Sequence, residues 1–210
     1  MGLAISPVRE YASPMETAVS VKALEPGLLH DFLDFFDRRA FADNRDWSAC
    51  YCRFFHAASL GAWERLTGNE NRAAAARDIA AGRMRGYLAY ANGRAIGWCA
   101  VDSRSAYPML ASFPALTGPG DEKVAAIVCL IVEKDHRRMG IALSLVEAAI
   151  DGARKSGFLS MEAYPRRPKD GAALSDAEAY PGPRSLYARL GFAEVREAGD
   201  RNVVSLKLSR

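Results

Sequence analysis

The stretch of sequence that decides the fold joins an apolar run to an amphipathic segment and reads Val132-Glu133-Lys134-Asp135-His136-Arg137-Arg138-Met139-Gly140-Ile141-Ala142. Residues 124–132, which lead into it, are continuously apolar, as is typical of a buried central strand. Residues 140–156 carry apolar side chains around much of a helical surface, and Gly157 follows where a helix commonly ends. The pattern predicts a strand, a tight turn and a helix.

The turn between this strand and this helix has the chemistry of a phosphate site. The first turn of a helix leaves four backbone N–H groups without partners and carries partial positive charge. Gly140 and Ala142 would let a phosphate approach these N–H groups closely, and Arg137 or Arg138 would add a charge-assisted hydrogen bond. The sequence therefore predicts a pyrophosphate site at this helix N-terminus.

Two common phosphate-binding motifs are excluded. A P-loop needs Gly-Lys followed by Ser or Thr at the helix start, and the turn lacks this sequence. A dinucleotide fingerprint needs three spaced glycines, and only Gly140 is present. The turn does contain the pattern R-x-x-G-x-A, formed by Arg137, Gly140 and Ala142.

This pattern resembles the coenzyme A motif of the GNAT superfamily of N-acetyltransferases, which reads Q/R-x-x-G-x-G/A and follows the fourth strand. Near the C-terminus, Tyr187-Ala188-Arg189-Leu190-Gly191-Phe192 is similar to the superfamily signature Y-x-x-x-G-F. The resemblance covers roughly residues 16–208. It implies a mixed α/β fold whose central, mostly antiparallel sheet is flanked by helices and splayed between its fourth and fifth strands.

The resemblance also implies how acetyl-CoA, the acyl donor, would bind. The backbone N–H groups of residues 138–142 would hold the pyrophosphate, and the backbones of Leu130 and Val132 would bond the pantetheine arm. The expected acetyl-CoA-binding residues are Leu130, Ile131, Val132, Arg137, Arg138, Met139, Gly140, Ile141 and Ala142. No metal is expected.

Tyr187 is the candidate general acid, because in many superfamily members this tyrosine protonates the departing coenzyme A thiolate. A phenol titrates at about 10 and a thiol at about 8.5, so a phenol can donate at neutral pH. The alternative is a core tyrosine, with Gly191 ending its helix. The sequence also departs from many relatives, which carry an asparagine where Tyr180 stands, seven residues before the tyrosine.

The general base is marked less clearly. Some relatives place a glutamate on the fourth strand, but residues 124–128 contain no carboxylate. Glu162 on the next predicted strand is the first candidate, followed by Glu122 and His56. Each could instead be structural or solvated, with a chain of water molecules carrying the proton to bulk solvent.

The acceptor amine is expected to bind in the less regular parts of the chain. Residues 47–55 are unusually aromatic, and residues 103–122 form a long loop rich in Ser, Pro and Gly. The pattern W-x-x-C-x-C in the aromatic stretch is similar to one in a GNAT subgroup without an assigned substrate. The expected acceptor-binding residues are Trp47, Tyr51, Phe54, Trp98 and Tyr180. The alternative for this aromatic cluster is ordinary core packing.

The rest of the chain completes one domain. The sequence predicts a loose tail at residues 1–15 and a single GNAT-like domain at residues 16–210. The clearest hairpin joins strands 86–91 and 94–102 through Asn92-Gly93, the preferred type I′ turn pair. The other predicted elements are strand 17–24, helix 28–37, helix 69–85 with Asn69 or Asn71 as its cap, strand 159–164, helix 185–190, and strands 192–196 and 203–208.

The composition limits the partners. The formal net charge is only +3, which does not indicate nucleic acid, and no apolar stretch is long enough to cross a membrane. The basic cluster at residues 164–169 is either a solvated loop or a contact for an anionic ligand. Without a visible secretory signal, the protein is expected to be cytoplasmic. The cysteines lack the spacing of a zinc site and are expected to be reduced thiols: Cys50, Cys52, Cys99 and Cys129.

The sequence therefore predicts an acetyl-CoA-dependent N-acetyltransferase in which the amine of a small molecule attacks the thioester directly. A backbone N–H near Leu130 would stabilise the oxyanion. Two alternatives remain open: an acyltransferase that uses another acyl-CoA or a protein substrate, and a coenzyme A-binding regulatory module without turnover. Many relatives pair, so a homodimer is compatible with the resemblance.

Overall fold

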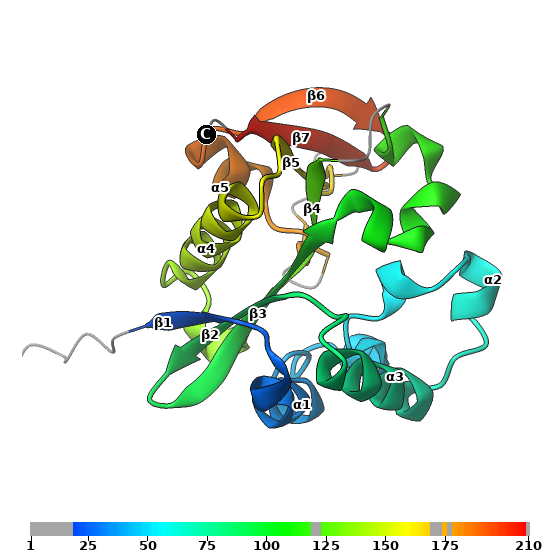
Figure 1. Cartoon of the computed structure of the whole chain (residues 1–210), viewed down its shortest axis with the longest axis vertical. Coiled ribbons are helices and arrows are strands. Elements are labelled where there is room, and N and C mark those ends of the chain that lie inside the picture. The colour runs from blue at the N-terminus through cyan, green and yellow to red at the C-terminus, as the bar shows by residue number, and fades with distance from the viewer. Residues whose placement is uncertain (1–18, 119–122, 169–173, 176–177, 209–210) are drawn as a thin grey trace, which may run out of the picture.

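The computed structural model describes residues 19–118, 123–168, 174–175 and 178–208, and the predicted tail at residues 1–15 lies outside them. The described strands form a seven-stranded sheet in the order β1-β2-β3-β4-β5-β7-β6 (Figure 1). The strands are β1 (Ser20–Ala23), β2 (Gly86–Ala91), β3 (Arg94–Ser103), β4 (Val124–Val132), β5 (Ser160–Ala163), β6 (Ala193–Ala198) and β7 (Arg201–Lys207). Neighbouring strands are antiparallel except β4 and β5, which are parallel.

Helices cover both faces of this sheet. The α-helices are α1 (Leu29–Arg38), α2 (Leu60–Trp63), α3 (Gly68–Ala80), α4 (Ile141–Lys155) and α5 (Arg184–Arg189). α4 packs against β2, β3 and β4, and α1 packs against β3 and α3 on the opposite side (Figure 1). Two apolar clusters follow from this arrangement, one beneath α4 and one beneath α1 and α3. The predicted mixed α/β fold is confirmed.

The splay of the sheet begins at a β-bulge in β4. The pairing of β4 with β3 passes from Val101↔Ile127 to Ala100↔Cys129, which leaves Val128 as the extra residue. The pairing of β4 with β5 also ends at Ile127. A bulge bends its strand, so the second half of β4 departs from β5 and continues beside β3 alone. The resemblance implied a splay between the fourth and fifth strands, and the structure has it at this place.

Most predicted elements agree with the structure to within a few residues. The hairpin turn at Asn92-Gly93 has positive φ at both residues, 51° and 73°, as a type I′ turn requires. The cap predicted for the helix at residues 69–85 was wrong. Thr67 caps α3 in a capping box with Glu70, while the buried Asn71 donates to the carbonyl of Ala49.

The stretches without clear periodicity fold as short helical turns. Residues 38–68 contain the 3₁₀ helices η2 (Arg45–Cys50) and η3 (Phe54–His56) before α2. The predicted loop at residues 103–122 contains η4 (Arg104–Ala106), η5 (Pro108–Ser112) and η6 (Pro114–Leu116), and its last four residues lie outside the described part. These pieces pack aromatic and apolar side chains against the face of the sheet opposite α4.

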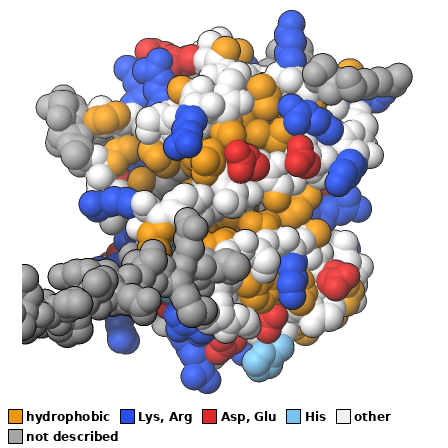
Figure 2. Space-filling view, turned by 90° about the vertical axis from the view of Figure 1, so that its left-hand side faces the viewer, with side chains coloured by type: hydrophobic (Ala, Val, Ile, Leu, Met, Phe, Trp, Pro, Cys, Tyr) orange, Lys and Arg blue, Asp and Glu red, His pale blue; other side chains and the backbone are white. Residues whose placement is uncertain are grey.

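Surface charge, helix length and the state of the cysteines complete the description of the fold. On the side shown in Figure 2, basic and acidic side chains are interspersed among hydrophobic ones, without a continuous basic surface. None of the helices in the described ranges has the length and apolar character needed to cross a bilayer. All four cysteines are free thiols.

Candidate active site

The turn between β4 and α4 is open toward a pocket. Gly140 is the N-cap of α4, has a φ of 83°, and leaves the helix without a side-chain cap. A Cβ placed at Gly140 would meet no atom of the described residues within 4 Å. The first helical turn therefore has open space beside its N-cap and no side chain that caps its backbone N–H groups, which is what a diphosphate needs there. We call this turn, residues 137–142, the cradle.

The cradle forms one wall of a pocket of about 890 Å³, here called the cradle pocket. Its lining includes Leu130, Ile131, Val132, Arg137, Arg138, Gly140, Ile141 and Ala142, which are all but one of the predicted acetyl-CoA-binding residues. The exception is Met139, which is 64% exposed and does not line the pocket. Residues 182–186 and Arg189 contribute to the lining from α5 and the segment before it. The end of β4 and the cradle therefore line one pocket, and their role in binding acetyl-CoA stays a prediction.

Arg137 holds the cradle in place. Its Nε donates to the carbonyl of Val132 at 3.1 Å, and its two terminal nitrogens pair with the Asp43 carboxylate at 2.5 and 3.0 Å. The hydrogen bond from Arg137 lowers the pKa of Asp43, so this pair is charged at neutral pH. Arg137 thus ties the end of β4 to residues 41–44. No local sequence pattern marks the contribution of Asp43, which lies 94 residues away along the chain.

The second half of β4 has a partner other than β5. The backbone N–H of Leu130 donates to the carbonyl of Tyr180 at 2.7 Å. Residues 180–182 therefore run beside β4 after β5 has ended. In this conformation the predicted oxyanion donor is engaged within the chain, and its role in catalysis stays a prediction.

Tyr187 lies directly behind this segment. Its side chain is fully buried, and its hydroxyl donates to the carbonyl of Pro181 at 2.5 Å. Burial raises the pKa of Tyr187 well above its ordinary value, so the phenol keeps its proton at neutral pH. A Cβ at Gly182, where φ is 84°, would lie 2.9 Å from the Tyr187 hydroxyl and 3.1 Å from Cδ2 of Leu130. Gly182 therefore packs closely against both the Tyr187 hydroxyl and the Leu130 side chain.

Glu162 is enclosed by cationic and hydroxyl partners. It accepts from Arg104 at 3.0 Å and from the Tyr164 hydroxyl at 3.2 Å, while Arg196 stands 4.0 Å away. Arg104 and Glu162 are both buried, and Glu162 lines neither the cradle pocket nor the second pocket described below. These contacts are those of a structural ion pair, and the predicted base role stays a prediction.

The other two candidates for the general base are His56 and Glu122. Burial lowers the pKa of His56 to about 4, so its imidazole is neutral at physiological pH. Its ring packs edge-on against Tyr107 with a centroid distance of 5.2 Å, and it lines neither pocket. Glu122 lies outside the described residues.

A second pocket, of about 700 Å³, lies on the face of the sheet opposite α4 and is here called the aromatic pocket. Three of the predicted acceptor-binding residues line it: Trp47, Phe54 and Tyr180. The predicted loop at residues 103–122 contributes residues 112–116 to the lining. Sequence reasoning missed other residues of the lining, among them Phe41, Trp63, Cys129, Arg166, Asp200 and Arg201. Phe41, Arg166 and Tyr180 line both pockets, so the two cavities meet at these residues.

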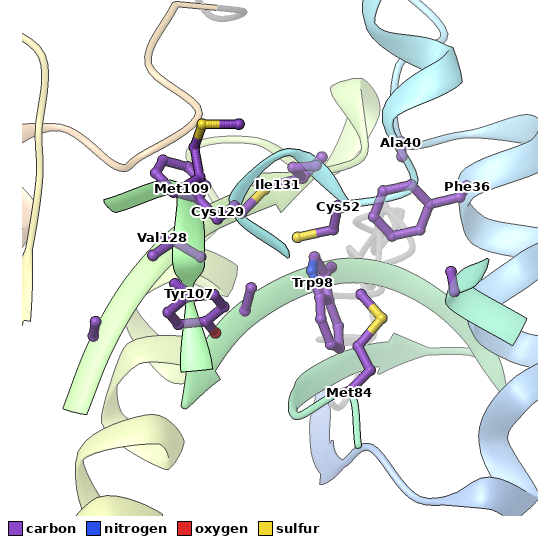
Figure 3. Packing of buried hydrophobic residues seen from close by; sticks show 14 of the residues in the cluster. Phe36, Ala40, Cys52, Met84, Trp98, Tyr107, Met109, Val128, Cys129 and Ile131 are labelled. Carbon is purple, nitrogen blue, oxygen red and sulfur yellow. The ribbon is translucent and has the colours of Figure 1, made fainter. Parts of the chain in front are cut away.

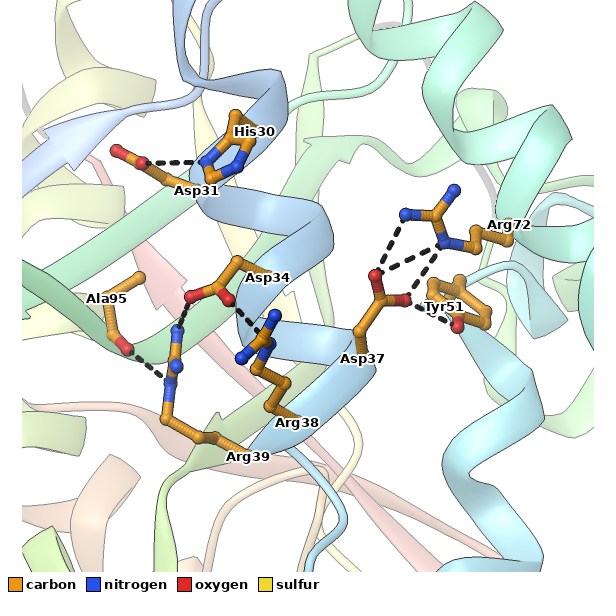
Figure 4. A network of polar contacts seen from close by, with 9 residues as sticks. All are labelled: His30, Asp31, Asp34, Asp37, Arg38, Arg39, Tyr51, Arg72 and Ala95. Atoms are coloured by element: carbon orange, nitrogen blue, oxygen red, sulfur yellow. Dashed lines mark hydrogen bonds and ion pairs between the residues drawn. The ribbon is translucent and has the colours of Figure 1, made fainter.

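Two predicted acceptor-binding residues lie elsewhere. Tyr51 donates its hydroxyl to Asp37 at 2.7 Å, and Arg72 clamps the same carboxylate (Figure 4). Trp98 is fully buried and packs edge-on against Phe32 at 5.1 Å, with Cys52 above it in the core (Figure 3). Neither residue lines the aromatic pocket. The structure thus favours the alternative of core packing for Trp98 and a surface contact for Tyr51.

Comparison with known families identifies this arrangement. The sequence matches the family described as "Acetyltransferase (GNAT) family" over residues 41–192, which is well over half of the chain. The chain belongs to the GNAT acetyltransferase family. It is therefore an acyltransferase of the family whose acyl donor is acetyl-CoA.

Solved GNAT structures share the fold at low sequence identity. Salmonella typhimurium yncA, solved with acetyl-CoA, has 14% identity and a TM-score of 0.53, with 91% of this chain and 95% of that chain covered. The paiA N-acetyltransferase of Thermoplasma acidophilum, solved with coenzyme A, has 13% identity and a TM-score of 0.53, with 90% and 99% covered. The ribosomal-protein-S18-alanine N-acetyltransferase of Escherichia coli has 15% identity and a TM-score of 0.51, with 92% and 96% covered. No curated protein matches the sequence significantly.

Proposed function

We propose that this GNAT acyltransferase transfers the acetyl group of acetyl-CoA directly to the amine of a small molecule. The observation that carries the proposal is the meeting of two pockets at Tyr180 and Arg166, beside the opening in β4. One pocket begins at an uncapped helix N-terminus, which suits a diphosphate. The other is lined by aromatic side chains, which suits an organic acceptor.

The cradle residues would position the acyl donor. The backbone N–H groups of residues 138–142 would hold the pyrophosphate, while the strand end at residues 130–132 would align the pantetheine arm. Acetyl-CoA supplies an activated thioester carbonyl. Leu130 would offer its backbone N–H to the carbonyl oxygen once the Tyr180 carbonyl withdraws.

The remaining residues would manage the proton transfers. A bond forms between the acceptor nitrogen and the acetyl carbon, and the bond from that carbon to sulfur breaks. The departing thiolate receives a proton from Tyr187, which burial keeps protonated. The nitrogen loses its proton through water to bulk solvent or to a base, for which Glu162 remains a candidate.

The size and the lining of the aromatic pocket support a small acceptor over a protein. Its walls come from several separate parts of the chain: residues 41–63, residues 112–116, Cys129, Arg166, Tyr180 and residues 198–201. Its volume of about 700 Å³ lies in the range of about 300–1,000 Å³ that is usual for small-molecule sites. A relative of the same fold acts on a ribosomal-protein alanine, so a peptide acceptor is the alternative to test.

We expect acetyl-CoA-dependent thiol release with at least one small amine that bears an apolar group. The measurement is a screen of small amines and of peptides with free N-terminal alanine or serine, in which a thiol reagent detects free coenzyme A. Turnover confined to the peptides would contradict the small-molecule acceptor. Binding of acetyl-CoA without turnover on any amine would instead support the regulatory module.

A second prediction concerns the ion pair between Arg104 and Glu162. Replacing Arg104 with Met leaves Glu162 buried without its main cationic partner, which we expect to lower the free energy of unfolding by about 3–5 kcal/mol. Urea denaturation measures this loss, with Arg154→Met, which breaks an exposed pair with Asp151, as the control.

The variant Glu162→Gln separates a structural carboxylate from a base. Because Glu162 is paired with Arg104 and Tyr164, we expect the variant to have a lower melting temperature and an unchanged pH profile of kcat/KM. If Glu162 is the base, the acidic limb of that profile will disappear in the variant.

A further inference from the structure

Arg166, at the boundary between the two pockets, has unused hydrogen-bonding capacity. It lines both pockets, and its side chain is 26% exposed. Its Nε is buried, and no acceptor among the described residues hydrogen-bonds to it. Asp200 offers Oδ2 at 3.9 Å, which is beyond hydrogen-bonding distance. A partly buried guanidinium whose Nε lacks a hydrogen bond is costly, and the exposed part of the side chain is what a ligand in the pocket can reach, so Arg166 favours an anionic ligand.

The charges around Arg166 also favour an anion. The guanidinium groups of Arg166 and Arg201 each lie 5.6 Å from the ring centre of Tyr180. Asp200 is 3.9 Å from each arginine, so the two cations share this carboxylate, and the other acidic side chain of the pocket lining is Asp46. Arg201 already donates to the Tyr180 hydroxyl at 2.7 Å and to the Tyr164 carbonyl at 3.3 Å. Arg166 is therefore the arginine better placed to bind a ligand carboxylate.

The rest of the aromatic pocket suits an apolar body. Its walls carry Phe41, Trp47, Phe54, Phe55, Trp63, Phe113 and Leu116. The ring of Trp47 meets that of Tyr180 edge-on at 5.0 Å, and the ring of Trp63 meets that of Phe54 at 5.4 Å. Such a lining favours the binding of a large aliphatic or aromatic group, because burying this group removes apolar surface from water.

The location of Arg166 limits how far the amine can be from the anion. The amine must meet the acetyl group where the two pockets join, and Arg166 stands at that junction. An acceptor that satisfies both contacts carries its amine and its carboxylate within a few bonds of each other. A residue at a peptide N-terminus lacks such a carboxylate, because it forms the next peptide bond.

We propose that the acceptor is a free α-amino acid with a large apolar or aromatic side chain, and that Arg166 binds its carboxylate. This inference rests on the proposed function and makes it more specific. The side chain of the amino acid fills the aromatic pocket, and its α-amine faces the opening beside Leu130.

The test compares amino acids with amines that differ only in lacking the carboxylate. The pairs are L-tryptophan with tryptamine and L-phenylalanine with 2-phenylethylamine, each assayed with acetyl-CoA and wild-type, Arg166→Gln or Arg167→Gln protein. Arg167 is the control, because it is adjacent in sequence but pairs with Glu197 and lines neither pocket. Comparing each variant with the wild type cancels the intrinsic reactivity of each amine.

We expect Arg166→Gln to lower kcat/KM for the amino acid by about 10- to 100-fold, mainly through KM. The value for the amine without a carboxylate should change by less than about threefold, and Arg167→Gln should change neither. An equal loss with both members of a pair would overturn the inference, because it would indicate a structural role. A raised KM for acetyl-CoA would also overturn it, by assigning Arg166 to the donor site.

A binding measurement keeps the inference testable if no amine is acetylated. In that case the proposed function fails, and the melting temperature is measured with coenzyme A and either L-tryptophan or tryptamine. A stabilisation specific to L-tryptophan that disappears in Arg166→Gln supports the carboxylate site. Equal stabilisation by both compounds, or by neither, contradicts it.

Discussion

Replacing Tyr187 with phenylalanine is expected to lower kcat by about 10²-fold or more, with little change in the affinity for acetyl-CoA. The substitution removes the proton that burial keeps on the phenol, so the coenzyme A thiolate must leave without a donor. The ring and its packing against Phe192 are retained. Steady-state kinetics with a good acceptor give kcat, and equilibrium titration with acetyl-CoA gives the affinity.

Tyr164→Phe is the matched control for this experiment. Tyr164 is also fully buried, also donates its hydroxyl within the chain, to Glu162 at 3.2 Å, and like Tyr187 lines neither pocket. The two tyrosines differ in their partners, because the Tyr187 hydroxyl bonds Pro181, which is next to Gly182 in the lining of the cradle pocket. Loss of the Tyr164 hydroxyl should affect stability more than turnover. Unchanged turnover in Tyr187→Phe would remove Tyr187 from the mechanism, and equal losses in both variants would indicate a general effect of losing a buried hydroxyl.

Replacing Gly140 with glutamate is expected to abolish the stabilisation of the protein by acetyl-CoA. In the wild type, ligand at about 100 times its Kd should add about 2.7 kcal/mol to the free energy of unfolding and raise the melting temperature. The glutamate would place bulk and negative charge where the diphosphate meets the first turn of α4. Thermal unfolding with and without acetyl-CoA measures the shift.

Gly157→Glu is the control at the other end of the same helix. Gly157 has a φ of 79°, against 83° at Gly140, and a Cβ there also meets no described atom within 4 Å. Both variants therefore carry similar backbone strain. Gly157→Glu should keep the acetyl-CoA shift, whereas a shift retained by Gly140→Glu would contradict the cradle as the diphosphate site.

The sequence predicted the strand, turn and helix around the cradle, because this part of the fold depends on local structure. Gly140 needs its positive φ, and the helix after it needs its apolar face, and both requirements leave a mark within a few residues. The hairpin at Asn92-Gly93 was predictable for the same reason. Strands 86–91 and 124–132 carried enough apolar residues to be assigned without tertiary information.

The acceptor side was predicted less well, because it is assembled from distant segments. Trp98 and Trp47 are both tryptophans in apolar surroundings, and their sequences do not show that one is buried in the core and the other lines a pocket. Arg166 belonged to a basic cluster with two open interpretations, and only the fold places it beside Tyr180 and Arg201. The bulge at Val128 depends on pairing with β3 and had no local signature.

The hydrogen bond between the Leu130 N–H and the Tyr180 carbonyl makes the two substrates interdependent. If acetyl-CoA must bind the Leu130 N–H, the measured affinity for acetyl-CoA includes the free energy of displacing the Tyr180 carbonyl. Tyr180 also lines the aromatic pocket, so the same displacement changes the shape of the proposed amine-binding site. Linkage then requires that each substrate alter the dissociation constant of the other by an equal factor, whichever of them arrives first.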